Sequence, residues 1–428
     1  MTDEVKVGIA GLGTVGVGVI KILNQNADLI KKRCGKNIIV SAVSARDKSK
    51  DRGVNLDGIK WYDNSVDIAN SDVDIVIEVI GGEAGDALQL CENALNNGKH
   101  VVTANKALIA KNGNDLAKIA QSKDVHIAFE AAVAGGIPII KSLKEGMVAN
   151  NISVVMGIMN GTCNYILTQM KETGRDFEDV LKEAQDLGYA EADPTFDVDG
   201  IDTAHKLAIL TSLAYGVKLD FDSIYIEGIR KIALSDIKYA GELGYKIKLL
   251  GISKKINGQI QQAVYPCLLP DTASMAKVDG VNNAVLLRGD FVGDVVLEGP
   301  GAGEGATASA VVADIVDIVA ERFSYPLNVK AEDMDSIESV SIDSHIGKFY
   351  IRLNVKDQSG VLAKITDILG EYDISVDTVL QKANKSDNTA HVVIVTHEQK
   401  ESDIVRAVKE IVQLENVVNS SCLIRIEE

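Results

Sequence analysis

Short apolar runs alternate with longer helical or polar stretches along the first third of the chain. The apolar runs cover residues 5–10, 38–43, 73–80, 99–102 and 125–130. Between them, residues 17–23 and 84–97 have the apolar content of helices, whereas residues 24–37 are mostly polar. Strands that alternate with helices indicate a parallel sheet with helices on both faces. We therefore expect an α/β fold that begins with a doubly wound parallel sheet.

Three glycines directly follow the first apolar run and open the first helix. Gly11, Gly13 and Gly16 have the G-x-G-x-x-G spacing of a Rossmann-type dinucleotide site. Gly11 would allow the tight turn, Gly13 would let the backbone approach a pyrophosphate, and Gly16 would let the helix pack against the strand. Free N–H groups at the helix start would then face the phosphates. A glycine-rich turn without a ligand is the alternative, but the strand–turn–helix setting favours a cofactor.

The end of the second apolar run bears on which dinucleotide is bound. An acidic residue there would bind the ribose 2′-hydroxyl of NAD, but the sequence places Arg46 at this point. A guanidinium suits a 2′-phosphate, so Arg46 favours NADP over NAD. A solvated loop arginine is the alternative, and the separation from Gly11 exceeds the roughly 20 residues of the usual pattern.

Two lysines stand where a reaction could use them. Lys106 follows the run at 99–102, at the carboxyl end of a predicted strand, where open α/β sheets bind ligands. Lys206 lies one turn after Asp202 in a helix predicted for 201–215 that is apolar on most faces. A buried lysine beside a carboxylate has a movable pKa and can exchange a proton with a substrate hydroxyl, as hydride transfer requires. The alternative is an i,i+4 ion pair on the surface, and His205 beside it is expected to pack or lie on the surface.

Two irregular segments could hold further ligands. Glu130 precedes a run of small residues up to 138 whose carbonyl oxygens could bind a hard monovalent cation; a plain domain crossover is the alternative. A second glycine-rich turn at 299–305 lies between a strand at 295–297 and a helix at 306–322. This turn could close over the cofactor or simply return the chain to the first domain.

The remaining pattern divides the chain into further units. A strand at 154–159 starts a second sheet and ends in a polar turn at 160–164, a helix follows at 177–187, and residues 188–200 form an acidic loop. The last eighty or so residues form a separate unit that reads βαββαβ, which is typical of a ferredoxin-like domain and has no catalytic grouping. We expect a dinucleotide-binding domain over 1–135, completed by about 305–330, an α+β substrate, catalytic and dimerisation domain over 136–304, a linker over 331–347 and the small binding domain over 348–428.

Composition and charge exclude several classes of function. The 428 residues carry a net charge of −17 without a long basic cluster, so nucleic acid is not expected as a partner. The five cysteines are scattered and form no C-x-x-C pair, which indicates a reducing compartment and no structural zinc. The acidic start does not suit a secretory signal, and no apolar run approaches the ~18 residues of a membrane span. These features predict a cytoplasmic protein without membrane contact.

The ordered motifs resemble those of homoserine dehydrogenases over nearly the whole chain. They are the glycine turn from Gly11, Thr-Ala-Asn-Lys ending at Lys106, Met-Asn-Gly-Thr-Cys-Asn-Tyr-Ile-Leu from Met159, and Gly-Tyr-Ala-Glu-Ala-Asp-Pro leading to Asp202 and Lys206. The resemblance implies that Lys206 donates and accepts the proton, with Lys106 between cofactor and substrate. It further implies roles for three sets of residues: substrate contacts at Glu191, Asp202, Thr162 and Tyr189, cofactor contacts at Thr14, Val15, Thr103, Gly188 and Gly303, and sodium ligands at Glu130, Val133, Gly135 and Ile137.

The last unit resembles an ACT domain, a module that senses small molecules. Asp357, Gly360 and Val361 fall in its ligand turn, and the resemblance implies threonine as effector and a homodimer or homotetramer. The expected reaction is the NAD(P)-dependent interconversion of L-aspartate 4-semialdehyde and L-homoserine in amino-acid biosynthesis. Two alternatives stay open here. An ACT-bearing hydroxy-acid dehydrogenase would need a histidine and a carboxylate in its site, and a non-catalytic dinucleotide sensor would not need a buried Asp202–Lys206 pair.

Overall fold

Six parallel strands form the amino-terminal sheet, in the order β3-β2-β1-β4-β5-β6. They are β1 (Glu4–Ala10), β2 (Asn37–Ser44), β3 (Lys60–Tyr62), β4 (Ile75–Glu78), β5 (His100–Thr103) and β6 (Ile127–Ala128). The central strands β1 and β4 are apolar and buried because helices cover both faces of a parallel sheet. The predicted doubly wound Rossmann sheet is thus confirmed in this computed structural model, which describes residues 4–336, 338–384 and 388–428.

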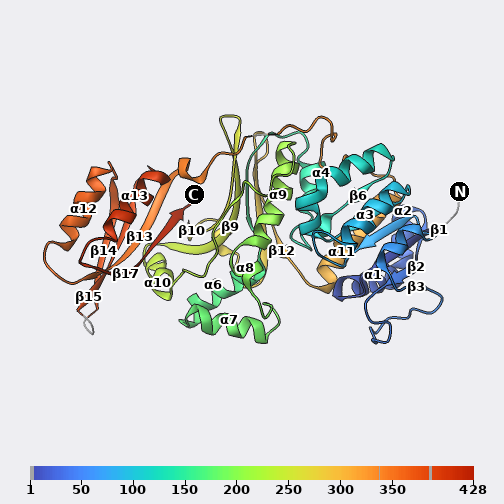
Figure 1. Cartoon of the computed structure of the whole chain (residues 1–428), viewed down its shortest axis with the longest axis horizontal. Helices are drawn as coiled ribbons and strands as arrows, with labels where there is room; N and C mark the ends of the chain where they lie inside the picture. Colours follow the sequence, from blue (N-terminus) through green and yellow to red (C-terminus); the bar gives the residue numbers. More distant parts are fainter. Residues whose placement is uncertain (1–3, 337, 385–387) are drawn as a thin grey trace.

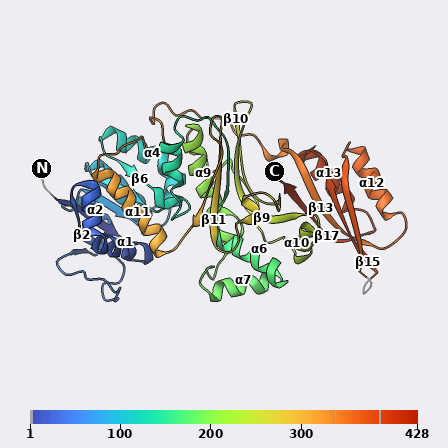
Figure 2. The same cartoon turned by 180° about the vertical axis from the view of Figure 1, so that it is seen from behind.

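The helices of this unit come from distant parts of the chain. One face carries α1 (Thr14–Gln25), α2 (Ala27–Cys34) and α11 (Glu304–Val319), and the other carries α3 (Asp86–Asn96), α4 (Lys106–Ser122) and the 3-10 turn η1 (Ser65–Asn70). Figure 2 shows α11 beside α1 and α2, although α11 comes about 280 residues later in the sequence than these two helices. The polar stretch 24–37 contains α2, a two-turn helix whose only fully buried side chain is Ile30. Such a short helix depends on its docking, which a polar pattern does not reveal.

A second, mostly antiparallel sheet follows. Its central strands run in the order β12-β11-β7-β9-β10, with β8 paired to β10. Their bounds are β7 (Ile152–Ile158), β8 (Tyr225–Ile226), β9 (Tyr245–Ile256), β10 (Gln259–Pro270), β11 (Asn282–Gly289) and β12 (Gly293–Pro300). The helices of this part are α5 (Ile139–Lys141), α6 (Gly161–Thr173), α7 (Phe177–Asp186), α8 (Thr195–Val198), α9 (Ile201–Tyr215) and α10 (Leu234–Glu242). Figure 1 shows α9 between this sheet and α4 of the Rossmann unit, so both units bury it.

The carboxyl-terminal unit has the predicted βαββαβ order. Its elements are β13 (Ile346–Lys356), α12 (Val361–Glu371), β14 (Val376–Asn384), β15 (Thr389–Thr396), the short β16 (Gln399–Lys400), α13 (Glu401–Ile411) and β17 (Val417–Ile426). The sheet order β17-β13-β15-β14 is antiparallel, and the helices enclose an apolar core of its own. Shorter turns along the chain are η2 (Glu130–Ala132), η3 (Ser142–Gly146), η4 (Met275–Lys277) and η5 (Ile342–Ser344).

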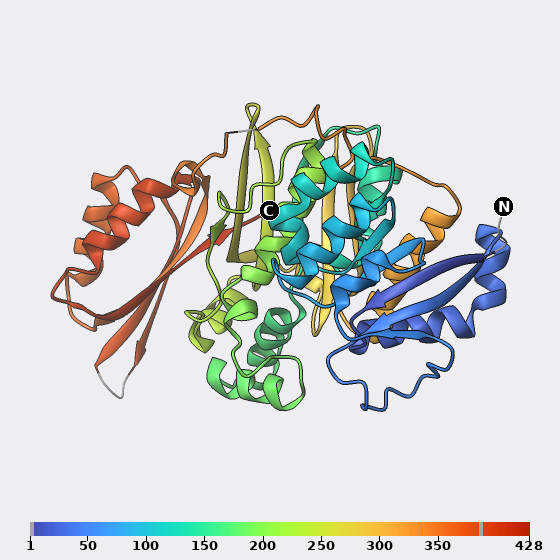
Figure 3. The same ribbon diagram turned by 45° about the vertical axis from the view of Figure 1, so that its right-hand side comes forward.

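This last unit is less separate than the sequence indicates, because its sheet continues the second sheet. Strand β17 pairs in parallel with β10 at Arg425 and Ile426, and Figure 3 shows β17 running towards the middle of the molecule. Buried polar contacts reinforce the joint: Tyr265 donates to Glu427 at 2.7 Å. Pairing between strand edges uses backbone groups, so a side-chain pattern carries no sign of it. Among the described residues, no helix combines enough length and apolar character to cross a membrane.

Candidate active site

The glycine turn between β1 and α1 has the shape of a phosphate cradle. Gly11 has φ +105°, and a Cβ there would lie 2.5 Å from the carbonyl oxygen of Val79. A Cβ on Gly16 would lie 2.0 Å from the carbonyl oxygen of Gly11, so the helix approaches the turn closely. At Gly13, by contrast, a Cβ would meet nothing within 4 Å, and no side chain caps α1 there. The first N–H groups of α1, from Thr14 onward, are therefore available to a pyrophosphate, as the G-x-G-x-x-G pattern requires.

The end of β2 lies beside this cradle. Gly11 N donates to Ser44 O at 2.9 Å, which places the exposed Arg46 two residues beyond the contact. A second arginine at this edge was not singled out from the sequence. Arg52 donates from Nε to Leu12 O at 3.2 Å and lies 5.5 Å from the ring of Trp61. Its guanidinium is thus committed to the protein, whereas that of Arg46 is open to solvent.

Helix α9 brings the two lysines to one carboxylate. Asp202 accepts from Lys206 Nζ through Oδ2 at 2.7 Å and pairs with Lys106 Nζ through Oδ1 at 2.9 Å. Lys206 also donates to Met159 O at 2.6 Å. The side chains of Asp202 and Lys206 are only 4% and 11% exposed, and that of Lys106 is 33% exposed. The alternative of a surface ion pair is therefore wrong, because α9 is buried between α4 and the strands of the second sheet.

Burial and charge move the three pKa values in different directions. Burial by itself would raise the pKa of Asp202, but the ammonium groups of Lys206 and Lys106 outweigh it and hold this pKa well below its ordinary value. For Lys206, burial outweighs the attraction of Asp202 and lowers the pKa, and the charge of Lys106 lowers it further. For Lys106, the attraction of Asp202 outweighs burial and raises the pKa. One lysine is thus tuned to release a proton and the other to stay charged.

Asn160 and Asp197 belong to the same cluster and were missed as functional residues. Asn160 Nδ2 donates to Asp197 Oδ1 and to Asp202 Oδ2, at 2.8 Å each. Its Oδ1 accepts from Cys163 N at 2.8 Å, so Asn160 caps α6. Residues 161–164, predicted as a polar turn, are therefore the first turn of a helix. Asn is a preferred N-cap residue, so the sequence did carry a signal for this helix start. The polar residues directly after a strand also fit a turn, and the turn was predicted instead.

Residues 188–200, predicted as an acidic loop, contain the short helix α8 and cover this cluster from one side. Thr162 Oγ1 donates to Tyr189 O at 2.6 Å, which ties the loop to the start of α6. Phe196 lies 5.4 Å below the Lys106 ammonium and also stacks on His205. His205 was expected to pack or to lie on the surface, and the structure shows the first: it is buried between Phe196 and Phe221. The carboxylate of Glu191 is exposed, and its charge helps to raise the pKa of Lys106.

Two other sequence-predicted residues have their side chains occupied inside the protein. Thr103 Oγ1 donates to Glu78 Oε2 at 2.6 Å, and Glu78 Oε1 accepts from Ile80 N and Gly81 N. This arrangement shapes the turn after β4. Glu130 accepts from Ile140 N and Lys141 N at 2.9 and 2.8 Å, so its carboxylate caps α5.

The two irregular segments pack against each other. A Cβ on Gly135 would lie 2.6 Å from Gly301 O, and Gly136 N donates to Pro300 O at 3.0 Å. The turn leads through Gly303 into α11, where Glu304 pairs with Lys21 of α1 at 2.7 Å. Within the described chain no three His, Cys, Asp or Glu side chains are grouped for a metal ion. A cation in this loop would have to use backbone carbonyls, such as those of Val133 and Ile137.

The predicted effector turn leads into α12, which lies at the end of the molecule away from α4 and α9 (Figure 1). Gly360 has φ +86° and precedes α12, while Val361 is buried at its start. Asp357 is exposed, and its N–H donates to Asn388 O at 3.0 Å.

Comparison with known proteins decides the family. The family model "Homoserine dehydrogenase" matches residues 138–316, and "Homoserine dehydrogenase, NAD binding domain" matches residues 11–130. The chain belongs to the homoserine dehydrogenase family. The family model "ACT domain" also matches, over residues 349–416. The enzyme is thus an NAD(P)-dependent oxidoreductase that interconverts L-aspartate 4-semialdehyde and L-homoserine, and the two alternatives weighed from the sequence are set aside.

Relatives match over their full length. Homoserine dehydrogenase of Pseudomonas aeruginosa is 45% identical over 99% of both chains, and that of Bacillus subtilis is 39% identical over 99% of this chain and 98% of its own. The crystal structure of a homoserine dehydrogenase from Thiobacillus denitrificans has a TM-score of 0.93 at 43% identity, covering 99% of this chain and 98% of that one. A hyperthermophilic archaeal homoserine dehydrogenase in complex with NADPH covers 75% of this chain and 99% of its own, with a TM-score of 0.65 at 27% identity.

Proposed function

We propose that Lys206 is the proton donor and acceptor of the homoserine dehydrogenase reaction and that Lys106 stabilises the charge on the reacting oxygen. The observation that carries this assignment is the single buried carboxylate of Asp202 between the two lysines. A bound nicotinamide cofactor supplies or accepts the hydride at the substrate carbon.

In the direction of reduction, the aldehyde oxygen gains negative charge as the hydride arrives. Lys206 gives that oxygen a proton and becomes a neutral amine, and in oxidation the neutral amine takes the hydroxyl proton back. Its lowered pKa makes the neutral form accessible. Lys106 keeps its proton because its pKa is raised, so it acts through its charge. Asp202 holds both ammonium groups in place. Further substrate contacts are assigned to Glu191, Thr162 and Tyr189.

The cofactor assigned to this site is NADP. Arg46 is exposed two residues beyond Ser44, whose carbonyl oxygen accepts from Gly11 N at the cradle, and a guanidinium there suits a 2′-phosphate. Further cofactor contacts are assigned to Thr14, Val15, Thr103, Gly188 and Gly303. A sodium ion is assigned to the carbonyl oxygens of Glu130, Val133, Gly135 and Ile137, a loop of small residues that a hard cation suits.

The ACT unit is assigned as the receptor of an amino-acid effector, with threonine as the effector. The turn Asp357–Val361 leads into α12, whose first N–H groups can hold a carboxylate. Turnover measured against threonine should respond in the intact chain and lose that response in Asp357→Ala. We assign a cytoplasmic location from the scattered cysteines, and a homodimer or homotetramer from the resemblance to ACT-bearing enzymes.

Lys206→Met tests the central assignment, since methionine matches the apolar stem of lysine in length and lacks the ammonium group. We expect turnover to fall about a hundredfold to ten-thousandfold, the usual worth of a general acid–base group. NADP binding, measured by fluorescence titration, should stay unchanged because the glycine cradle is built from another part of the chain. Lys206→Arg should be equally poor, since a guanidinium does not release its proton. Near-normal turnover in either variant would exclude Lys206 as the proton carrier.

A further inference from the structure

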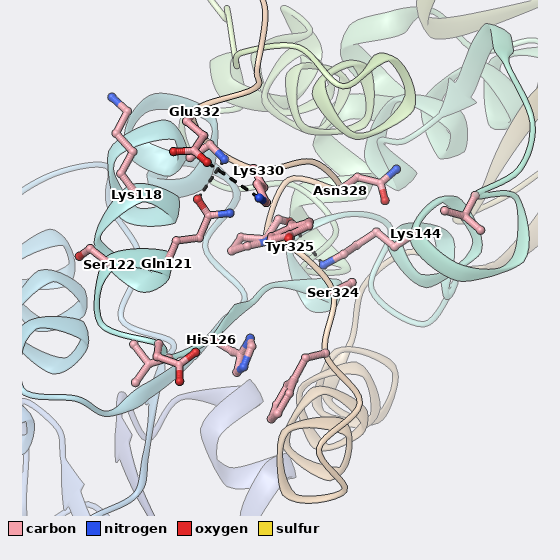
Figure 4. A pocket seen from close by; sticks show the side chains of 16 residues that line it. Lys118, Gln121, Ser122, His126, Lys144, Ser324, Tyr325, Asn328, Lys330 and Glu332 are labelled. Carbon is pink, nitrogen blue, oxygen red and sulfur yellow. Dashed lines mark hydrogen bonds and ion pairs between the residues drawn. The ribbon is translucent and has the colours of Figure 1, made fainter.

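A large pocket lies at the opposite end of α4 from Lys106. It has a volume of about 940 Å³ and is formed by the end of α4, the segment 144–148 and residues 323–332 (Figure 4). Helix α4 has 17 residues and therefore spans about 25 Å, which separates the pocket from the reacting lysine. Cavities of roughly 300–1,000 Å³ are typical of small-molecule sites. The proposed reaction uses no residue of this pocket.

One wall of the pocket is apolar and aromatic. Val148, Phe323 and Tyr325 are 65%, 48% and 44% exposed, although large apolar side chains normally avoid water, and all three line this pocket. The Phe323 ring lies parallel to that of His126, with centroids 3.6 Å apart. Burial lowers the pKa of His126 to about 4, so this imidazole is neutral near pH 7 and adds a flat, uncharged surface. The wall therefore suits a flat apolar body.

The ammonium group of Lys144 lies next to that wall and has no carboxylate within 4 Å among the described residues. Three lysines line the pocket, and two of them have carboxylate partners: Lys118 pairs with Asp115 at 2.8 Å and Lys330 with Glu332 at 4.0 Å. Lys144 Nζ reaches only the carbonyl oxygen of Pro326, at 3.4 Å, and no carboxylate of the described chain lies within 4 Å of it. Figure 4 shows this ammonium pointing towards Tyr325 and Ser324.

A polar donor on the opposite side is also unused. Gln121 accepts from Ala331 N at 2.9 Å through Oε1, while its Nε2 has no hydrogen-bond partner among the described residues. An ammonium without a carboxylate partner within 4 Å selects an acceptor that carries negative charge. The buried Gln121 Nε2 is a further donor without a partner at the pocket wall.

We propose that this pocket binds a small organic anion, in which a carboxylate or phosphate contacts Lys144 and a flat apolar body lies against Phe323 and Tyr325. The aromatic wall supplies burial and stacking, and the ammonium supplies a charge-assisted hydrogen bond. The pocket is thus a third ligand site of the enzyme, separate from both the active site and the ACT turn.

Calorimetric titration of the full chain with benzoate tests the proposal, because benzoate combines a flat ring with one carboxylate. We expect saturable binding, and binding of the uncharged isostere benzamide should be about tenfold weaker or more. Lys144→Met and Phe323→Leu should each weaken benzoate binding by about the same factor. Lys118→Met is the matched control at the rim, and Lys206→Met controls for uptake at the active site; both should bind benzoate like the unaltered chain.

Three results would overturn the proposal. The first is that the unaltered chain takes up no benzoate, as happens if a second copy of the chain fills the pocket in solution. The other two are that Lys144→Met, or Phe323→Leu, binds benzoate as tightly as the unaltered chain. Circular dichroism of Lys144→Met and Phe323→Leu shows whether each variant is folded before it is titrated. If one of them is unfolded, the other still decides the outcome, since both contacts are required.

Discussion

Lys106 and Lys206 share the carboxylate of Asp202, yet their surroundings move the pKa values of their ammonium groups in opposite directions. Lys206 projects from a helix that is buried along most of its length, whereas Lys106 starts α4 at the edge of the Rossmann sheet and is one-third exposed. The same carboxylate therefore serves a lysine that can lose its proton and a lysine that keeps it. The following predictions test this division and the parts of the fold that support it.

Lys106→Met should move the pH dependence of homoserine oxidation to higher pH. Oxidation needs the neutral amine of Lys206, so its rate rises with pH as that group loses its proton. The charge of Lys106 lowers the pKa of Lys206, and removing the charge lets this pKa rise. kcat measured against pH checks this. Lys111→Met, on the same helix but paired with Asp222 at 2.5 Å, is the matched control and should leave the profile in place. An unshifted profile in Lys106→Met would mean that the two lysines are not coupled.

Asn160→Ala should lower kcat far more than it changes KM. Asn160 donates to both Asp197 and Asp202, and a hydrogen bond to a charged group contributes about 1.5–3 kcal/mol, or roughly a tenfold to a hundredfold change in rate. Because the amide orients Asp202 through Oδ2, the oxygen that also accepts from Lys206, the chemical step should suffer while the substrate still binds. Asn160→Asp adds a third carboxylate and should be worse. A change confined to KM would show that Asn160 holds the substrate and not the catalytic carboxylate.

Alanine at Gly13 and at Gly16 should separate cofactor binding from folding. A Cβ at position 13 meets no protein atom within 4 Å, so Gly13→Ala should keep its thermal stability and bind NADP about tenfold more weakly or worse. A Cβ at position 16 would lie 2.0 Å from Gly11 O, so Gly16→Ala should lose about 1–3 kcal/mol of stability. Thermal melts and fluorescence titrations give the two quantities. Undisturbed NADP binding in Gly13→Ala would place the pyrophosphate elsewhere.

Arg46→Ala should weaken NADP binding selectively. The guanidinium can contact a 2′-phosphate, which NAD lacks, so the dissociation constant of NADP should rise while that of NAD stays the same. Titration of the variant with each cofactor checks this expectation. Equal weakening of both cofactors, or a preference for NAD in the unaltered enzyme, would show that Arg46 does not read the 2′-phosphate.

Asp236→Ala should destabilise the contact between α10, which carries Asp236, and β13 of the ACT unit. Asp236 is fully buried and accepts from Arg352 Nε and Nη2 at 2.5 and 3.0 Å and from Tyr350 at 3.0 Å. Its removal leaves the Arg352 charge buried without a partner, at a cost of about 3–5 kcal/mol. Lys382→Met breaks the exposed pair with Glu242 at the same joint and should cost less than about 1 kcal/mol. If the two variants unfold at similar urea concentrations, the buried Asp236–Arg352 pair contributes no more to stability than the exposed Lys382–Glu242 pair, and the prediction is wrong.

The local sequence pattern determined those features that depend on neighbouring residues. The glycine spacing after the first strand predicted the cradle at Gly11, Gly13 and Gly16, and the apolar helix at 201–215 was predicted with the bounds that α9 has. The βαββαβ order of the last unit was equally clear. Periodicity and turn residues act over a few positions, so these elements can be inferred without knowing what they pack against.

The tertiary structure decided which distant residues meet. It brought Lys106 to Asp202 across 96 positions, placed α11 on α1, and joined β17 to β10. It also turned Asn160, which the sequence placed in a polar turn, into the bridge between Asp197 and Asp202. Such contacts depend on how whole elements pack and on backbone pairing at sheet edges, and the local order of residues carries no signal for either. The sequence determined the elements of this protein, and packing decided which of their polar groups became a site.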